Sequence, residues 1–293
     1  MRKTASLTLG FVVLVLSSHA RPAPRRQADE DSVTFVGAGD VANCEQLGGA
    51  RATASLLDGI AGTIFTLGDH AYPRGSAKDF ADCYDPTWGR HKARTRPAIG
   101  NHDLLTGHGQ PYFDYFGENA GPKYRGYYSY DLGAWHILSL NGTETVKATS
   151  PQAMWLREDL ASHPSDCVLA YWHMPMFSSG PHGGGPEMKE VWKILYDAGA
   201  DVVISSHDHV YERFAPMDAN GKVDEKRGIR EFLVGTGGAS VYKFQKPAPN
   251  SEVRDNSTYG VLKFTLSKGR YAWQFIPMAG QKFTDSGSAT CSP

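Results

Sequence analysis

The stretch Asp201-Val202-Val203-Ile204-Ser205-Ser206-His207-Asp208-His209 joins a short apolar run to two histidines one residue apart. The apolar part has the length and the β-branched content of a buried strand, so both imidazoles are expected at a strand end. Imidazole is a common metal ligand. The stretch therefore predicts one part of a metal site, and other strand ends must supply the rest.

Four other apolar runs, at residues 33–36, 63–67, 97–99 and 168–172, end in the same style. They close in Gly39-Asp40, Gly68-Asp69, Gly100-Asn101-His102-Asp103 and His173. A single Asp or His at a strand end is usually a cap or a solvated turn residue. In open α/β sheets, however, ligands gather outside the carboxyl ends of the strands. Five such ends together therefore favour a shared metal site in one crevice.

These motifs, in this order, resemble the metallophosphoesterase superfamily, whose pattern is Asp, Gly-Asp, Gly-Asn-His-Asp/Glu, His and Gly-His-x-His. The resemblance spans residues 40–209. More narrowly, residues 68–72 fit the Gly-Asp-x-x-Tyr of purple acid phosphatases, and residues 207–213 are close to their His-x-His-x-Tyr-Glu-Arg. Ser206 stands where the family usually carries Gly, and Val41 follows Asp40 where the wider superfamily often carries x-His. Neither departure removes a ligand.

Hydrophobic periodicity alone predicts an α/β or α+β protein. Helical patterns cover residues 48–57, 151–160 and 186–198, and strand patterns cover residues 127–131, 135–140, 231–234, 260–266 and 270–275. Residues 267–269 are expected to form a hairpin turn. The resemblance implies that the strands form two mixed sheets flanked by helices, as a four-layer αββα metallophosphoesterase sandwich.

The resemblance also implies two metal ions. It makes Asp40, Asp69, Tyr72 and His209 the ligands of one ion, and Asp69, Asn101, His173 and His207 the ligands of the other, with Asp69 bridging. Two carboxylates and an ionised phenol carry three negative charges, which suits Fe(III) on the tyrosine side. A divalent Fe, Zn or Mn ion suits the imidazole side. The alternative is that Tyr72 is only a packing aromatic before Pro73. In that case the chain would still bind two metal ions, but it would not resemble a purple acid phosphatase.

Two such ions can hold a hydroxide that attacks phosphorus directly, which leaves histidines to protonate the leaving group. His102, beside Asn101, is the first candidate acid, and Asp103 is expected to orient it or to raise its basicity. His182 is the second, because it lies nine residues past His173, where the family carries substrate-contacting histidines. Its glycine-rich surroundings also fit a mobile surface loop.

Three further groups have weaker assignments. His70 is expected either behind the ligands or in the loop between them. Glu212 and Arg213 are predicted to brace the histidine pair. Gly235-Thr236-Gly237-Gly238 lacks the Lys-Ser/Thr of a phosphate-binding Walker loop, so it is expected to line the edge of the site or to turn the chain.

The predicted function is a secreted, acid phosphatase-like hydrolase of small phosphate monoesters. A phosphodiesterase or nucleotidase on the same scaffold is the enzymatic alternative, because a dimetal core attacks phosphorus whatever its second ester. The alternative from another class is a secreted protein that binds metal or phosphate without turnover. That alternative predicts the loss of a ligand or of the acid histidine, yet all seven ligand positions and His102 are present.

Residues 1–20 have the pattern of a secretory signal peptide, with a basic start, an apolar core at residues 7–16 and small residues before a cleavage site near Ala20. The core is too short for a permanent membrane anchor, although a retained signal anchor is the alternative. Residues 21–31 are predicted to be a disordered, proline-rich leader. Residues 32–293 contain no linker or repeat and are predicted to form a single calcineurin-like domain in the extracellular or periplasmic space.

The chain has 30 Lys and Arg against 31 Asp and Glu, for a formal net charge of −1. No global field therefore selects for nucleic acid or anionic membranes. The spacing of Cys44, Cys83, Cys167 and Cys291 differs from that of a zinc knuckle, and an exported chain favours disulfides. Of three possible pairings, we expect Cys44 with Cys83, because each lies just beyond a ligand-bearing loop, and Cys167 with Cys291.

Overall fold

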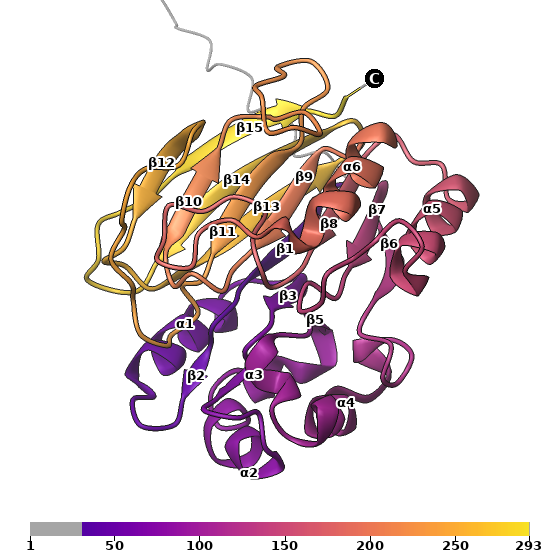
Figure 1. Cartoon of the computed structure of the whole chain (residues 1–293). Coiled ribbons are helices and arrows are strands. Elements are labelled where there is room, and N and C mark those ends of the chain that lie inside the picture. Colours follow the sequence, from indigo (N-terminus) through magenta and orange to yellow (C-terminus); the bar gives the residue numbers. More distant parts are fainter. Residues whose placement is uncertain (1–30, 293) are drawn as a thin grey trace, which may run out of the picture. The chain divides into compact units, whose positions relative to one another are not determined.

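Two mixed β-sheets form the centre of the computed structural model, which describes residues 31–292 (Figure 1). The first sheet has the order β15 (Ser286–Thr290), β14 (Arg270–Pro277), β13 (Gly260–Ser267), β1 (Val33–Ala38), β3 (Thr63–Leu67) and β5 (Thr95–Ala98). The second has the order β12 (Ser251–Asp255), β10 (Tyr211–Phe214), β11 (Arg230–Val234), β9 (Val202–Ser205), β8 (Val168–Tyr171), β7 (Trp135–Ser139) and β6 (Tyr128–Leu132). A short parallel pair, β2 (Ala42–Asn43) and β4 (Ala71–Tyr72), lies beside them.

The ligand-bearing strands are the parallel ones. β1, β3 and β5 run parallel in the first sheet, and β7, β8, β9 and β11 run parallel in the second. The remaining pairs are antiparallel. The carboxyl ends of the parallel strands therefore meet at one edge of each sheet, where polar loops can come together.

Strand β9 contributes to two separate hydrophobic cores. Val202 packs in the core that also holds Phe35 of β1, whereas Val203 packs in a second core with Trp192. Successive side chains point to opposite faces of a strand, so a strand covered on both faces must be apolar throughout. This double burial explains the uninterrupted apolar run that precedes the histidine pair.

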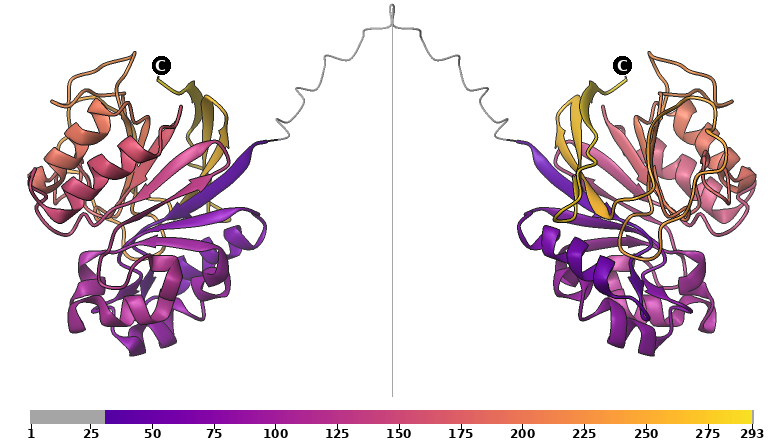
Figure 2. Two further views of the ribbon diagram at one scale, coloured as in Figure 1. Left: turned by 90° about the vertical axis from the view of Figure 1, so that its right-hand side faces the viewer. Right: turned by 90° about the vertical axis from the view of Figure 1, so that its left-hand side faces the viewer.

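Helices flank the two sheets. Those of the described chain are α1 (Gly48–Asp58), α2 (Ala77–Asp79), α3 (Asn101–Leu104), α4 (Gln110–Phe116), α5 (Pro151–Ser162) and α6 (Lys189–Asp197), with shorter or irregular turns η1 (Phe80–Tyr84), η2 (Trp88–Arg94), η3 (Gly107–Gly109), η4 (Gly117–Ala120) and η5 (Pro186–Met188). Figure 2 shows α5 and α6 against the second sheet and the indigo-to-magenta helices grouped apart from them. The predicted layered sandwich of two mixed sheets and flanking helices is confirmed.

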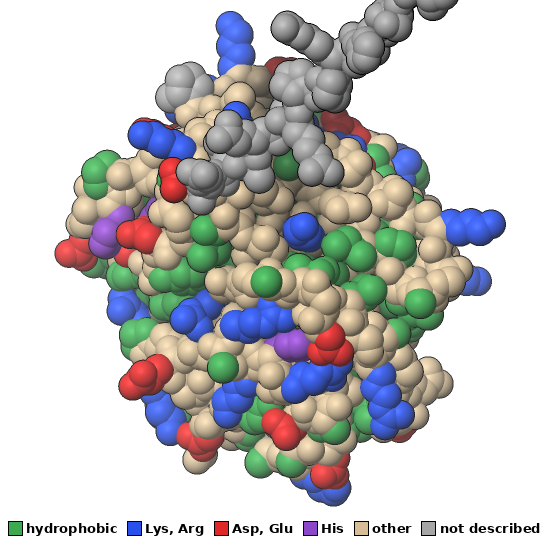
Figure 3. Space-filling model, turned by 180° about the vertical axis from the view of Figure 1, so that it is seen from behind, with side chains coloured by type: hydrophobic (Ala, Val, Ile, Leu, Met, Phe, Trp, Pro, Cys, Tyr) green, Lys and Arg blue, Asp and Glu red, His purple; other side chains and the backbone are tan. Residues whose placement is uncertain are grey.

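The predicted helices at residues 48–57 and 151–160 are also present, and the pattern at residues 186–198 begins as the single turn η5 before α6. Among the described residues, no helix is long and apolar enough to cross a membrane. The predicted signal peptide and nearly all of the predicted leader lie outside the described residues. On the face shown in Figure 3, lysine and arginine side chains are interspersed with acidic and hydrophobic ones.

Two disulfides join distant parts of the chain, with the predicted pairing. Cys44 pairs with Cys83, which links the segment after β2 to η1. Cys167 pairs with Cys291, which ties the segment after β15 to the start of β8. The backbone N–H of Ser292 donates to Oδ1 of Asp201 (2.6 Å), so the same segment is also held at the start of β9.

Candidate metal centre

Three strand ends carry their polar residue in a left-handed backbone conformation. The φ angles are 58° at Asp40, 52° at Asp69 and 71° at His207. A residue other than glycine pays about 1 kcal/mol or more for this conformation, and such residues cluster at functional sites. The loops after β1 and β3 also hydrogen-bond to each other, because the N–H of Val41 donates to the carbonyl of Asp69 (3.0 Å). The two acidic residues are therefore held side by side.

The tyrosine side of the centre is built around the Tyr72 hydroxyl. This hydroxyl lies 2.7 Å from Oδ1 of Asp40, 3.1 Å from Oδ2 of Asp69 and 3.0 Å from Nε2 of His209. Nε2 of His209 is 3.2 Å from Oδ1 of Asp40, and its Nδ1 lies 2.6 Å from the carbonyl oxygen of Ser240. The four residues predicted to bind one ion thus converge at one point.

The second group converges around Nε2 of His173. This nitrogen lies 2.9 Å from Oδ1 of Asn101, 3.3 Å from Oδ2 of Asp69 and 3.2 Å from Nδ1 of His207. Nδ1 of His173 lies 2.6 Å from the carbonyl oxygen of Leu67. Asp69 contacts both groups, which is the position that a bridging ligand requires.

Burial and close contacts shift the pKa values of the ionisable groups in this centre. Burial opposes ionisation of Asp40, but His209 lowers the pKa of this carboxyl below its ordinary value of 3.8. Burial, with Asp40 and Asp69, raises the pKa of the Tyr72 phenol well above 10. Burial also opposes the charged form of His173, yet Asp69 raises the pKa of this imidazole to about 9. Carboxylate, phenol, amide and imidazole donors at these distances fit two cations, which would displace the protons.

His102 lies at the rim of the centre. Its ring packs against Tyr72 with centroids 4.6 Å apart, and its Nε2 is 4.0 Å from Oδ2 of Asp69. The contact that orients the ring joins Nδ1 to the carbonyl oxygen of Pro73 (2.6 Å). His102 therefore lies on the tyrosine side of the centre.

Asp103 does not orient His102, so this expectation is wrong. Asp103 is the third residue of the short helix α3, and its carboxylate turns back to accept the N–H of Gly100, the residue that caps the helix (2.9 Å). The same carboxylate accepts the N–H of Asp69 (3.0 Å) and contacts Nδ1 of His70 (2.9 Å). Asp103 is therefore a buried residue that supports the backbone of Asp69, the predicted bridging ligand.

His70 lies behind the centre. Its ring is fully buried, with Nε2 2.6 Å from the hydroxyl of Thr66 and Nδ1 on Asp103. The ring is surrounded by Phe80, Tyr84, Tyr112 and Phe116. Because both nitrogens are engaged and the ring is enclosed, His70 supports the loop rather than facing a substrate.

His182 lies beside His207, on the histidine side of the centre. Its ring centroid is 4.4 Å from that of His207, and Nδ1 is 2.8 Å from Oδ1 of Asp208. Its loop is held by two buried glutamates. Glu231 accepts the N–H groups of residues 176 and 177 (3.1 Å each), and Glu212 accepts the N–H of Ser179 (2.8 Å). Glu212, expected to brace the histidine pair, therefore braces the loop that carries His182.

Two residues that touch the centre were not predicted to belong to it. The ring of Tyr242 stacks on His209, with centroids 4.0 Å apart and planes 9° apart, and lies 5.6 Å from His182. Ser206 places its hydroxyl 2.7 Å from the carbonyl oxygen of Leu67 and 3.0 Å from Nδ1 of His173. The unusual serine before the histidine pair was the available signal for Ser206, whereas no spacing marks Tyr242.

The glycine-rich stretch at residues 235–238 packs against the loop of Asp40. The N–H of Gly237 donates to the carbonyl of Gly39 (2.8 Å). A side chain at Gly235 would come within 2.2 Å of the carbonyl oxygen of Asp208 and 2.9 Å of the Asp40 carboxylate. The stretch thus lies at the edge of the centre, and its lack of side chains permits the close approach.

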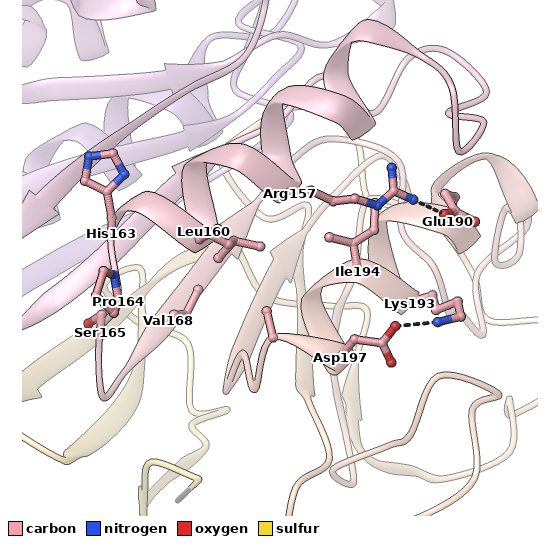
Figure 4. A pocket seen from close by; sticks show the side chains of 12 residues that line it. Arg157, Leu160, His163, Pro164, Ser165, Val168, Glu190, Lys193, Ile194 and Asp197 are labelled. Atoms are coloured by element: carbon pink, nitrogen blue, oxygen red, sulfur yellow. Dashed lines mark hydrogen bonds and ion pairs between the residues drawn. The ribbon is translucent and has the colours of Figure 1, made fainter.

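A cavity of about 570 Å³ lies between α5 and α6 (Figure 4). None of the predicted ligands lines it. The charged groups at its rim are already paired with each other, as Arg157 with Glu190 and Lys193 with Asp197. The chemistry of this chain is therefore assigned to the strand-end cluster and not to this cavity.

The calcineurin-like phosphoesterase family model matches residues 33–211, the range that contains the strand-end cluster. The chain belongs to this family, as predicted. It is 26% identical over 250 residues to purple acid phosphatase 18 of Arabidopsis thaliana, covering 78% of this chain and 55% of that one. Purple acid phosphatase 21 of the same plant is 30% identical over 206 residues, covering 61% and 47%. The chain thus spans about half the length of these curated relatives.

Solved structures show the same fold. A purple acid phosphatase, PPD1, from yellow lupin (Lupinus luteus) seeds superposes with a TM-score of 0.73 at 18% identity, covering 89% of this chain and 54% of that one. GAP50 of Plasmodium, the anchor in the inner membrane complex, superposes with a TM-score of 0.66 at 15% identity, covering 90% of both chains. A phosphatase and an anchor of a membrane complex share the architecture, so the architecture alone does not define the substrate.

Proposed function

We propose that the chain is a metal-dependent phosphatase of the purple acid type, which hydrolyses small phosphate monoesters. The observation that carries the proposal is the position of the Tyr72 hydroxyl, within 3.1 Å of Asp40, Asp69 and His209. A phenol amid two buried carboxylates and an imidazole is a hard donor set for a trivalent cation. The similarity to plant purple acid phosphatases supports the same assignment.

The proposed ligands are those implied by the sequence motifs. One ion, Fe(III), takes Asp40, Asp69, Tyr72 and His209, and a divalent ion takes Asp69, Asn101, His173 and His207. The family implies a dinuclear centre, and the donor atoms around Nε2 of His173 support the second position. When bound, two such ions polarise a phosphate oxygen and lower the pKa of a coordinated water.

The protein side chains at the rim complete the chemistry. His102 and His182 approach the centre from the tyrosine side and the histidine side respectively. Either ring can donate a hydrogen bond to a phosphoryl oxygen or a proton to a leaving oxygen. The half-buried ring of Tyr242 contacts the rings of both His182 and His209.

A small ester is the proposed substrate, and the proposed location is outside the cytoplasm. The interspersed charges on the face in Figure 3 and the net charge of −1 support a small anion over a nucleic acid. Two disulfides, Cys44 with Cys83 and Cys167 with Cys291, support an oxidising compartment.

The first experiment is a visible absorption spectrum with metal analysis on the same sample. We expect about two metal ions per chain with iron among them, and a broad visible band that Tyr72→Phe abolishes. Tyr84→Phe is the matched control, because the Tyr84 hydroxyl is buried and has no hydrogen-bond partner within the described residues. A colourless protein with two Zn or Mn ions would keep the phosphoesterase and remove the role of Tyr72, and a metal-free protein would contradict the proposal.

Hydrolysis assays separate the substrate classes. We expect 4-nitrophenyl phosphate to be hydrolysed with a larger kcat/KM than bis(4-nitrophenyl) phosphate. The reverse order would replace the monoesterase by a phosphodiesterase on the same centre. A protein that carries both ions and hydrolyses neither ester would be a metal-binding protein without turnover.

A further inference from the structure

We propose that Asp208, the residue between the two histidines of the pair, is a positioning residue that holds His182 toward the leaving group of the substrate. The inference rests on the proposed phosphatase function and assigns distinct roles to the two rim histidines. It is carried by the contacts of a buried carboxylate, not by a motif, because the residue between the histidines is variable in the pattern His-x-His.

The Asp208 carboxylate is enclosed by the loop that carries His182. Asp208 is fully buried. Its Oδ1 accepts the backbone N–H of His182 (3.1 Å) and contacts Nδ1 of the same residue (2.8 Å), while its Oδ2 accepts the hydroxyl of Ser178 (2.5 Å). A side chain at Gly180 would come within 2.3 Å of the carboxylate, so the loop approaches it closely only because this residue is glycine.

A buried carboxylate is expensive unless it is well partnered, and here its partners are all on one short loop. Ser178, Gly180 and His182 are fixed together by it, since the N–H of Gly180 also donates to the Ser178 hydroxyl (2.9 Å). Because the turn that holds Asp208 also carries His207 and His209, the carboxylate links the position of the loop to that of the two predicted ligands.

The carboxylate also selects the tautomer of His182. Because Nδ1–H is directed at Asp208, Nε2 is the nitrogen left to contact a substrate. Within the part of the chain that the structure describes, Nε2 has no hydrogen-bond partner. The side chain is about half exposed (45%), with its ring 4.4 Å from the ring of His207. This is the arrangement of a carboxylate-oriented imidazole whose free nitrogen faces a substrate.

The two rim histidines are therefore not equivalent. Nδ1 of His102 is held by a neutral carbonyl, that of Pro73, whereas Nδ1 of His182 is held by a carboxylate. The carboxylate fixes which nitrogen of His182 faces the substrate, so we assign the leaving oxygen to His182 and a phosphoryl oxygen to His102.

The proposed hydrolysis step needs one proton donor. A water oxygen bonds to phosphorus, and the ester P–O bond breaks with its electron pair on the leaving oxygen. Nε2–H of His182 gives that oxygen a proton. The proton lost by the water passes to solvent, from which His182 is protonated again.

The test compares two esters that differ in their need for a proton, 4-nitrophenyl phosphate and phenyl phosphate. We expect Asp208→Asn to lower kcat on phenyl phosphate about 10- to 100-fold and on 4-nitrophenyl phosphate by much less, with KM and metal content unchanged. Asp159→Asn is the matched control, because it alters another buried carboxylate paired with a histidine and leaves the ratio of the two kcat values unchanged. Equal losses on both esters would overturn the proposal.

A double-mutant cycle and a tautomer measurement keep the test independent of folding defects. We expect His182→Ala with Asp208→Asn to be within about twofold of His182→Ala alone, because the carboxylate acts through the ring. Long-range ¹H–¹⁵N NMR of the zinc-loaded protein should show the Nδ1–H tautomer of His182 in the wild type and its loss in Asp208→Ala. A wild type that shows this tautomer but hydrolyses neither ester would overturn the proposed function, while an active wild type with the Nε2–H tautomer would overturn the role of Asp208 alone.

Discussion

Two clusters of histidine and aspartate lie at opposite ends of the second sheet. The metal centre follows the carboxyl ends of β8 and β9, whereas His136 stands at the start of β7, beside the start of β8. Each cluster brings three donor atoms within 4.8 Å of one another: Asp69, His173 and His207 in the first, and His136, Asp159 and His163 in the second. Residue types and distances alone do not separate the two.

The partner of the second ring nitrogen separates them. In the metal centre, Nδ1 of His173 and Nδ1 of His209 are held by backbone carbonyls, so Nε2 of each ring is directed at the carboxylates. In the other cluster, Nδ1 of His136 lies 2.9 Å from Asp131 and Nε2 lies 2.8 Å from Asp159. Both nitrogens of that ring already have carboxylate partners, whereas the rings of His173 and His209 are oriented as ligands of a cation would be.

Removal of the bridging carboxylate should have the largest effect. We expect Asp69→Asn to lower the rate of phosphate-ester hydrolysis about 100- to 1000-fold and to reduce the bound metal below two ions per chain, because both proposed ions share this group. Asp159→Asn should leave the rate and the metal content unchanged. Steady-state kinetics with metal analysis checks both variants, and a metal-loaded, fully active Asp69→Asn would refute the ligand assignment.

The pair formed by His136 and Asp159 should affect the stability of the protein and not the rate of hydrolysis. We expect His136→Ala to lower the free energy of unfolding by about 3 kcal/mol, because it leaves the buried Asp159 carboxylate without its cationic partner. Urea denaturation measures this change. His163→Ala, which removes a half-exposed ring at the edge of the same cluster, should have a smaller effect. A large loss of hydrolysis in His136→Ala would instead connect this cluster to catalysis.

The same pair predicts a pH dependence of stability. Burial opposes the charged form of His136, but Asp159 and Asp131 raise its pKa above 6.5, so its contribution is complete below pH 6.5 and is lost as pH rises through the raised pKa. Burial opposes ionisation of Asp159, but His136 lowers its pKa below 3.8, so its contribution is lost only as pH falls through the lowered value. The destabilisation by His136→Ala should therefore be larger at pH 5 than at pH 9 in urea denaturation. Equal values would show that His136 stabilises the fold without its charge.

The smallest effect is expected at Ser206. Ser206→Gly restores the residue usual in the family and removes one contact of His173, but the carbonyl of Leu67 still holds the ring. We expect at most about a tenfold faster loss of one metal ion to a chelator, with an unchanged midpoint of thermal unfolding. Faster loss of both ions would mean that Ser206 supports the whole centre.

The predictable parts of this fold are the strands with uninterrupted apolar runs. β10 was not predicted, because Glu212 and Arg213 interrupt its apolar pattern. The charges of these two residues have partners in the fold. Glu212 accepts hydrogen bonds from Ser179, and Arg213 pairs with Asp285 (2.7 Å). The helices of residues 77–120 were missed for another reason, since segments of three to seven residues have no period to detect.

The metal centre was predictable because each proposed ligand ends a strand or follows one closely. The structure brings the seven side chains together, and their binding of metal stays a prediction. The role of Asp103 was not predictable from its place beside His102, because the direction of its carboxylate depends on the start of α3. Tyr242 and Asp208 act through contacts between loops that no spacing in the sequence reveals.

The left-handed conformations of Asp40, Asp69 and His207 have a consequence for the evolution of this fold. Each position stores backbone strain that glycine would relieve, while the centre needs the larger side chain there. If selection for hydrolysis is relaxed, substitutions should accumulate first at these three positions. The inactive descendants should then have a larger free energy of unfolding than their active ancestor. A relative with glycine at two of these strand ends would thus be recognisable from its sequence as an inactive protein that keeps the fold.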